Sequence, residues 1–151
     1  MFSIEAIMST NLITVTPSAT LAEARSLMHE NKIHHIPVVE DDRIVGLITL
    51  TNVLAATDSF LRDDQTRIHA DEIGIQDAMV ADVATVDINA SQRHAALFLA
   101  QHSIGCLPDL DGETLVGIIT DTDFVAVAIN LLEQIEETEP VSEEDYDVGA
   151  A

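Results

Sequence analysis

The sequence predicts an α+β fold built from two similar β-α-β-β-α units that pack sheet against sheet. The first observation behind this prediction is an internal repeat: when the chain is shifted by 71 residues, twelve of the 48 positions from Ile7 to Leu54 are identical. The second is that each copy places two β-rich runs between two helical patterns. A three-stranded half cannot bury its apolar face alone, so the halves are expected to pack on each other.

Each unit is predicted to begin with a short strand followed by a helix. The strands are expected over 12–17 and 83–88, which are rich in β-branched residues. In the first copy, Thr20 with Glu23 three residues later forms a capping-box signature for a helix start. Ser91 holds the same capping position in the second copy.

A hairpin and a second helix complete each unit. β-rich runs surround residues 41–42 in the first copy and 111–112 in the second, where the turn reads Asp-Gly. Asp-Gly between apolar runs is a strong hairpin signal. The second helices are expected to begin near Asn52 and Asp123.

The repeat also divides the chain. Residues 1–61 are predicted to form the first unit, 62–76 a polar linker and 77–132 the second unit. From Glu133 onward there are eight acidic residues and no basic one. Such a run cannot offset its ordering entropy by burial, so we interpret 133–151 as a disordered acidic tail.

Charge and composition narrow the classes of partner and compartment. The chain of 151 residues carries 27 acidic against 6 basic side chains, net −21, which disfavours nucleic acid and anionic membranes as partners. Its apolar runs are too short to cross a bilayer, and its start lacks the pattern of a signal peptide. Cys106 is the single cysteine, which fits a reducing compartment. We therefore expect a cytoplasmic protein.

The complete order of elements, occurring twice, resembles a known family. Each unit has an apolar-Pro strand entry, at Ile36-Pro37 and Leu107-Pro108, and a Gly-x-Ile-Thr-x-x-Asp/Asn segment. Over residues 4–132 this arrangement resembles a tandem pair of cystathionine-β-synthase (CBS) domains, the Bateman-type module. The resemblance implies a stand-alone regulatory module that binds an adenosine nucleotide or derivative between its units and signals by conformational change.

Thr120 and Asp123 are the first candidates for a binding site, because they stand where a strand ends and a helix begins. A helix N-terminus offers free N-H groups to a phosphate, and an acid can accept from the hydroxyls of a ribose. On the residues alone, a helix cap with a first-turn acid is the favoured interpretation; the resemblance reverses this and favours a nucleotide site. The first copy has Thr49 and Asn52 instead, and since an amide accepts more weakly than a carboxylate, we rank that site second.

The resemblance further implies residues around the adenine, drawn from the first strand and the apolar-Pro entry of each copy. They are Val15, Thr16, Ile36 and Pro37 in the first copy, and Val86, Asp87, Leu107 and Pro108 in the second. Each is equally suited to a core or turn position. Asp109 departs from the pattern, because it stands where the first copy has Val38.

His34 and His35 precede the first apolar-Pro entry, and the resemblance implies that they reach the phosphates of a ligand. Histidine titrates near neutrality, so such contacts would depend on pH. One alternative is a metal site that uses His29, His34 and His35, but no ligand motif such as His-x-x-x-His supports it, and we assign no metal. The other is a pair of ordinary histidines at a strand start.

These observations favour regulation over catalysis. No catalytic constellation is visible in the sequence, so we do not expect an enzyme. AMP, ADP, ATP and S-adenosylmethionine are the candidate ligands; the acidic chain favours AMP, ADP with Mg²⁺ or S-adenosylmethionine over free ATP. A homodimer through the second helices is expected, together with an unknown regulated protein. The alternative function is a protein-interaction adaptor with degenerate nucleotide sites.

Overall fold

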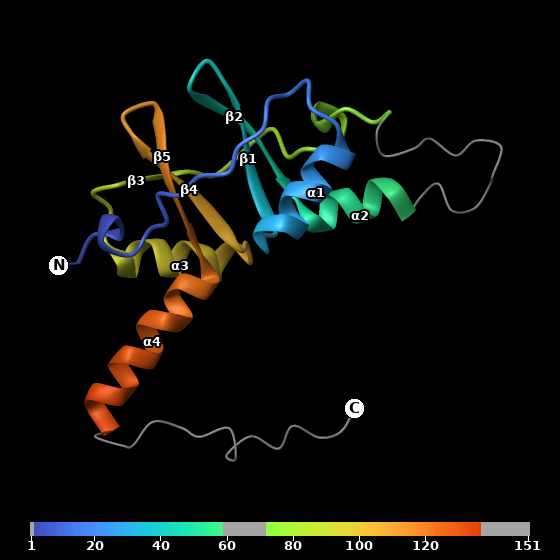
Figure 1. Cartoon of the computed structure of the whole chain (residues 1–151). Coiled ribbons are helices and arrows are strands. Elements are labelled where there is room, and N and C mark those ends of the chain that lie inside the picture. The colour runs from blue at the N-terminus through green and yellow to red at the C-terminus, as the bar shows by residue number, and fades with distance from the viewer. Residues whose placement is uncertain (1, 59–71, 137–151) are drawn as a thin grey trace, which may run out of the picture.

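The computed structural model describes residues 2–58 and 72–136, and its two halves stand side by side (Figure 1). The first half consists of α1 (Leu21–Asn31), β1 (His35–Glu40), β2 (Arg43–Thr49) and α2 (Leu50–Asp58). The second consists of β3 (Val86–Asp87), α3 (Gln92–His102), β4 (Cys106–Asp111), β5 (Thr114–Thr120) and α4 (Asp121–Glu136). Two short 3-10 helices, η1 (Ile4–Ala6) and η2 (Ile75–Asp77), precede the halves. The predicted α+β class with two similar units is confirmed.

The helix starts follow the capping signals in the sequence. The Thr20 hydroxyl accepts from the Glu23 N-H at 3.2 Å, and the Glu23 carboxylate accepts from the Thr20 N-H at 3.4 Å, which confirms the capping box. At the start of α3 the Ser91 hydroxyl accepts from the His94 N-H at 3.0 Å. These side chains satisfy N-H groups that the first turn of a helix cannot bond internally.

Both predicted hairpins are present. Strands β1 and β2 pair antiparallel around Asp41 and Asp42, whose φ angles of 53° and 63° suit a two-residue hairpin turn. The second turn lies one residue later than expected, because Asp111 still pairs with Thr114 across β4 and β5. Gly112 there has a φ of 63°, a conformation that glycine adopts without strain.

The opening strand of the first unit is much shorter than predicted. Over 12–17 only Val15 pairs, in a single parallel bridge to Val38, and Pro17 has no N-H to continue the ladder. In the second unit Val86–Asp87 do form a strand, β3, parallel to β4. The predictions of strands over 12–17 and 83–88 are therefore both wrong in their extent.

Each half completes its core with a segment from the start of the other half. Ile4 is fully buried in the second core, and Ile75 is fully buried in the first. Backbone bonds fix both: the Ile4 N-H donates to the Ala90 carbonyl at 3.0 Å, and the Ile75 N-H donates to the Ala19 carbonyl at 2.9 Å. We call residues 2–9 and 72–80 the leading segments; the N-terminal one lies beside α3 (Figure 1).

The leading segments also extend the hairpins of the opposite half. Ser9 pairs with Ile118 of β5 through N-H···O bonds of 2.9 and 3.0 Å. Val80 pairs in the same way with Leu47 of β2, at 2.9 Å in both directions. The pairing of Ser9 with Ile118 brings the chain after Ser9 beside the end of β5. Ile118 is only two residues before Thr120.

Candidate functional site

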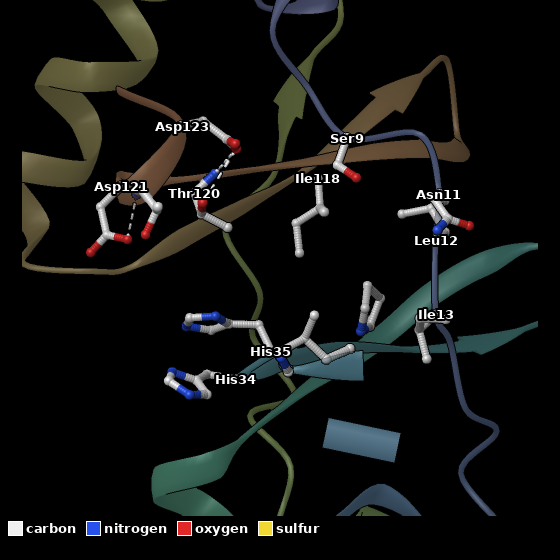
Figure 2. Close-up of a pocket in the computed structure, with 14 residues that line it drawn as sticks. Ser9, Asn11, Leu12, Ile13, His34, His35, Ile118, Thr120, Asp121 and Asp123 are labelled. Atoms are coloured by element: carbon white, nitrogen blue, oxygen red, sulfur yellow. Dashed lines mark hydrogen bonds between the residues drawn. The ribbon is translucent and has the colours of Figure 1, made fainter. Parts of the chain in front are cut away.

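A cavity of about 360 Å³ lies where the two halves meet. Figure 2 shows that its walls come from three parts of the chain: residues 9–13 after the N-terminal leading segment, residues 32–37 at the start of β1, and residues 118–123 where β5 passes into α4. These segments are far apart in the sequence, and only the packing of the halves unites them. The cavity is within the size range of small-molecule sites.

Thr120 and Asp123 form a pre-organised pair on one wall. The Asp123 Oδ2 atom accepts from the Thr120 N-H at 2.8 Å and from the Thr120 hydroxyl at 3.2 Å. Its Oδ1 atom accepts no hydrogen bond from the part of the chain that the structure describes. This oxygen remains able to accept from a hydroxyl of a bound molecule.

The first N-H groups around the start of α4 are already hydrogen-bonded within the protein. The Thr122 N-H donates to the Asp121 carboxylate at 2.9 Å, and the Asp121 N-H donates to the Gly105 carbonyl at 3.0 Å. The Thr120 N-H is held by Asp123. These three N-H groups are therefore already bonded, and a phosphate in this cavity would depend on other donors, such as those of the opposite wall.

The opposite wall carries Lys32, His34 and His35, and both histidine rings face the end of β5 and the start of α4 (Figure 2). Gly105 lies between the walls: a Cβ atom on it would stand 3.2 Å from the His35 Nε2 atom and 3.8 Å from the Asp121 Oδ2 atom. Burial lowers the pKa of His35 below 6.5; the Asp121 charge opposes this shift and His34 adds to it.

Of the residues expected around the adenine, one lines the cavity in the structure and the others do not. Pro37, although almost fully buried, lines the same cavity as the second unit's Thr120 and Asp123. The others do not line it. Ile36, Leu107 and Pro108 are buried, Val15 is buried, Val86 is half-buried, and Thr16 and Asp87 are exposed.

Residues 9–13 are the part of the cavity wall that the sequence did not indicate. Ser9, Asn11, Leu12 and Ile13 all line it. They reach Thr120 because Ser9 pairs with Ile118 across the two halves. The repeat alone carries no signal for a pairing between residues more than a hundred positions apart. Asp121 was also missed, although it directly follows Thr120.

Thr49 and Asn52 reproduce the same local geometry in the first unit. The Asn52 Oδ1 atom accepts from the Thr49 hydroxyl at 2.8 Å and from the Thr49 N-H at 3.1 Å. Because this uses the amide oxygen, the amide NH₂ group is what Asn52 can offer a ligand, a donor in place of the acceptor that Asp123 provides. The two motifs are therefore alike in shape and opposite in hydrogen-bonding character.

Two buried groups in β4 have strongly shifted pKa values. Asp109 is completely buried, and neither carboxylate oxygen has a hydrogen-bond partner among the described residues. Burial, with the Asp123 charge as the second cause, raises the pKa of Asp109 to about 7. Burial and the charges of Asp109 and Asp121 raise the pKa of the Cys106 thiol to about 12. The thiol is thus protonated and unreactive at neutral pH.

Within residues 2–58 and 72–136 no three His, Cys, Asp or Glu side chains are grouped so as to hold a metal ion, and this applies to the alternative set of His29, His34 and His35. The helices in the same ranges lack the combined length and apolar character needed to span a bilayer.

Comparison with known proteins supports the division of the chain into two similar halves. The sequence model of the CBS domain matches residues 4–59 and 75–130. The CBS domain-containing protein YhcV of Bacillus subtilis (strain 168) is 34% identical over 124 residues, which cover 82% of this chain and 84% of YhcV.

Two solved structures with similar folds hold adenosine compounds. CBSX2 in complex with AMP matches 87% of this chain and 98% of its own, at a TM-score of 0.74 and 25% identity. The CBS domain pair of protein MJ0100, in complex with 5′-methylthioadenosine and S-adenosyl-L-methionine, matches 87% of this chain and 98% of its own, at a TM-score of 0.75; at 22% identity this likeness concerns the fold. From the repeat, the fold and the matched residues together, the chain belongs to the CBS domain family, as a tandem pair.

Proposed function

We propose that this protein is a regulatory module that binds an adenosine-containing small molecule in the cavity between its two units. The observation that carries the proposal is the Asp123 carboxylate. One of its oxygens is fixed by Thr120, and the other is available on the wall of a cavity of about 360 Å³. This arrangement suits a ribose, because the available oxygen can accept a hydrogen bond from a ribose hydroxyl.

The other walls suit the remaining parts of such a ligand. Leu12, Ile13 and Pro37 offer apolar contacts to a flat base. Lys32, His34 and His35 lie across the cavity and would contact the 5′ substituent. AMP, S-adenosylmethionine and 5′-methylthioadenosine are the ligands named for proteins of this fold, which supports an adenosine compound here.

The expected output is a conformational change rather than a chemical reaction. A ligand in this cavity touches both units at once, so its binding favours the relative arrangement of the units that it contacts best. That shift would alter how the module meets a second copy or a regulated protein. The Thr49 and Asn52 pair is proposed as a second, weaker site, because it offers an amide instead of a carboxylate.

Isothermal titration with AMP and with S-adenosylmethionine tests this function. Asp123→Ala should reduce the affinity at least tenfold, since it removes the acceptor for the ribose. Asp111→Ala is the matched control: it removes the same charge from an exposed position outside the cavity lining and should leave the affinity unchanged. Undiminished binding by Asp123→Ala would contradict the assigned site.

A thermal shift assay with the same compounds separates a sensor from an adaptor with degenerate sites. A ligand at 100 times its Kd stabilises the folded state by about 2.7 kcal/mol if it does not bind the unfolded chain. A melting temperature that no adenosine compound changes would favour the adaptor.

A further inference from the structure

The wall of the cavity carries more negative than positive fixed charge. Among its described lining residues, Lys32 is a cation, whereas Asp121 and Asp123 are anions, so with both histidines neutral the sum is −1. In the proposed function, Asp123 binds the ribose. The end of the cavity that would receive the 5′ substituent therefore contains one further anion, Asp121, opposite Lys32 and the two histidines.

Asp121 is hydrogen-bonded through its carboxylate to one of the first N-H groups of α4. It is the first residue of α4, and its carboxylate accepts the Thr122 N-H at 2.9 Å. A free N-H group at a helix start is what attracts a phosphate, and here the Asp121 carboxylate already occupies it. Its Oδ2 atom and the His35 Nε2 atom both lie against Gly105, at 3.8 and 3.2 Å from the site of a Cβ atom there. The carboxylate thus shares the 5′ end of the cavity with His35.

The first unit shows that this acid is not required by the helix start. Leu50 stands at the equivalent position, at the start of α2, in an otherwise matching Thr-x-x-Asn segment. The same fold therefore forms with an uncharged side chain at this point. The charge at Asp121 is a property of this one cavity.

We propose that Asp121 determines the ligand class of the cavity, selecting an adenosine compound whose 5′ substituent is neutral or positively charged over one that ends in phosphates. This inference rests on the proposed function. A 5′ phosphate has to approach the like charge of Asp121, and like charges brought close together disfavour binding, although water screens the repulsion in part because Asp121 is exposed. A methylthio or sulfonium group meets no such repulsion, and a sulfonium is attracted.

The test compares two ligands that differ only at the 5′ position, AMP and 5′-deoxy-5′-methylthioadenosine, by isothermal titration at about pH 8. At this pH histidine is ordinarily neutral. The wild-type protein should bind the methylthio compound at least tenfold more tightly than AMP. Asp121→Asn keeps an oxygen for the Thr122 N-H but removes the charge; it should strengthen AMP binding at least fivefold and leave the methylthio compound unchanged. Asp111→Asn, outside the cavity lining, should change neither affinity.

A salt titration of the wild-type protein tests the role of the Asp121 charge without a substitution. Raising the salt concentration from about 0.05 M to about 0.5 M screens the repulsion, so the preference for the methylthio compound should shrink. If both compounds bind and neither Asp121→Asn nor salt alters their ratio, the role of Asp121 is refuted while the proposed function stands. Tighter binding of AMP than of the methylthio compound by the wild type would also refute it. If neither compound binds, the proposed function itself fails.

Discussion

Met8 lies directly on Gly117, with its Sδ atom 2.7 Å from the point where a Cβ atom of residue 117 would stand. Met79 lies on Gly46 in the same way, and the repeat places the two methionines and the two glycines at equivalent positions. Each leading segment is therefore held on the opposite hairpin by a methionine that only a residue without a side chain can accommodate. The contact joins the two halves and fixes Ser9, which lines the cavity.

Gly117→Ala is expected to lower both stability and ligand affinity. The added methyl group must displace Met8 and the neighbouring Ser9 carbonyl, which is 3.1 Å from the same point. Overpacking of this kind costs about 1 to 3 kcal/mol in the free energy of unfolding. Because Ser9 lines the cavity, the affinity for an adenosine compound should fall as well. Urea unfolding and isothermal titration measure the two effects.

Gly46→Ala is the matched control for that substitution. It creates the equivalent clash with Met79, but neither residue lines the cavity. Stability should fall to a similar degree, and the affinity should be kept. An equal loss of affinity in both variants would show that the leading segment of residues 2–9 does not act on the cavity through Ser9.

Asp109 should make the protein less stable as the pH rises. Burial raises its pKa to about 7, whereas in the unfolded chain an aspartate titrates near 3.8. The folded state therefore favours the protonated form: this contribution to stability is complete below about pH 4 and is lost as the pH rises through about 7. Between about pH 5 and pH 8 we expect a loss on the order of 2 kcal/mol in the free energy of unfolding. Urea unfolding at several pH values measures it.

Two substitutions separate the charge of Asp109 from its shape. Asp109→Asn should abolish this part of the pH dependence, since an amide does not titrate. Asp109→Val introduces the residue that the first unit has at Val38, and it should be more stable than the wild type at pH 8, because it removes an unpartnered polar group from the core. An unchanged pH profile in Asp109→Asn would show that Asp109 does not titrate in this range.

AMP binding should strengthen as the pH falls. Burial lowers the pKa of His35 below its ordinary value, against the opposing charge of Asp121 and with His34 adding to the shift, so the ring is protonated to a greater extent as the pH falls. A protonated ring attracts the phosphate and offsets the charge of Asp121. From about pH 7.5 to pH 5.5 we expect roughly a fivefold gain in AMP affinity by isothermal titration, about 1 kcal/mol. His35→Gln should remove most of the gain, and 5′-methylthioadenosine should show none. A pH response shared by both ligands would assign it to another group.

The apolar face of α4 is expected to join two copies of the protein. Val125, Ile129 and Leu132 recur at helical spacing and are 57%, 50% and 51% exposed, and no residue of α4 is buried. An exposed apolar stripe of this kind marks an interaction surface. Ile129→Glu should convert a dimer into a monomer in sedimentation equilibrium, whereas Asn130→Glu, an exposed neighbour that gains the same charge, should not. A monomeric wild type would contradict this interface.

Features that depend on neighbours in the chain could be predicted from the sequence. The capping box of Thr20 and Glu23 and the hairpin at Asp41 and Asp42 form from residues that are at most three apart, so their chemistry is visible in the sequence itself. The repeat of 71 residues then indicates two units of one fold. Of the predicted linker over 62–76, residues 62–71 lie outside the described residues, and Ile75 in the remainder is buried in the first core. Of the predicted tail over 133–151, residues 137–151 lie outside them, and residues 133–136 are still part of α4.

The sequence by itself thus determined the two units, their local elements and the pair of Thr120 and Asp123, because each rests on short-range hydrogen bonds and periodic burial. Only the tertiary structure decided what faces that pair. The adenine contacts expected in the second unit include Leu107 and Pro108, yet the cavity that Thr120 lines is formed with Pro37 and residues 9–13. The physical reason is the exchange of leading segments: their pairing with the opposite hairpin depends on the shape of two packed cores, and no local pattern in the chain encodes that shape.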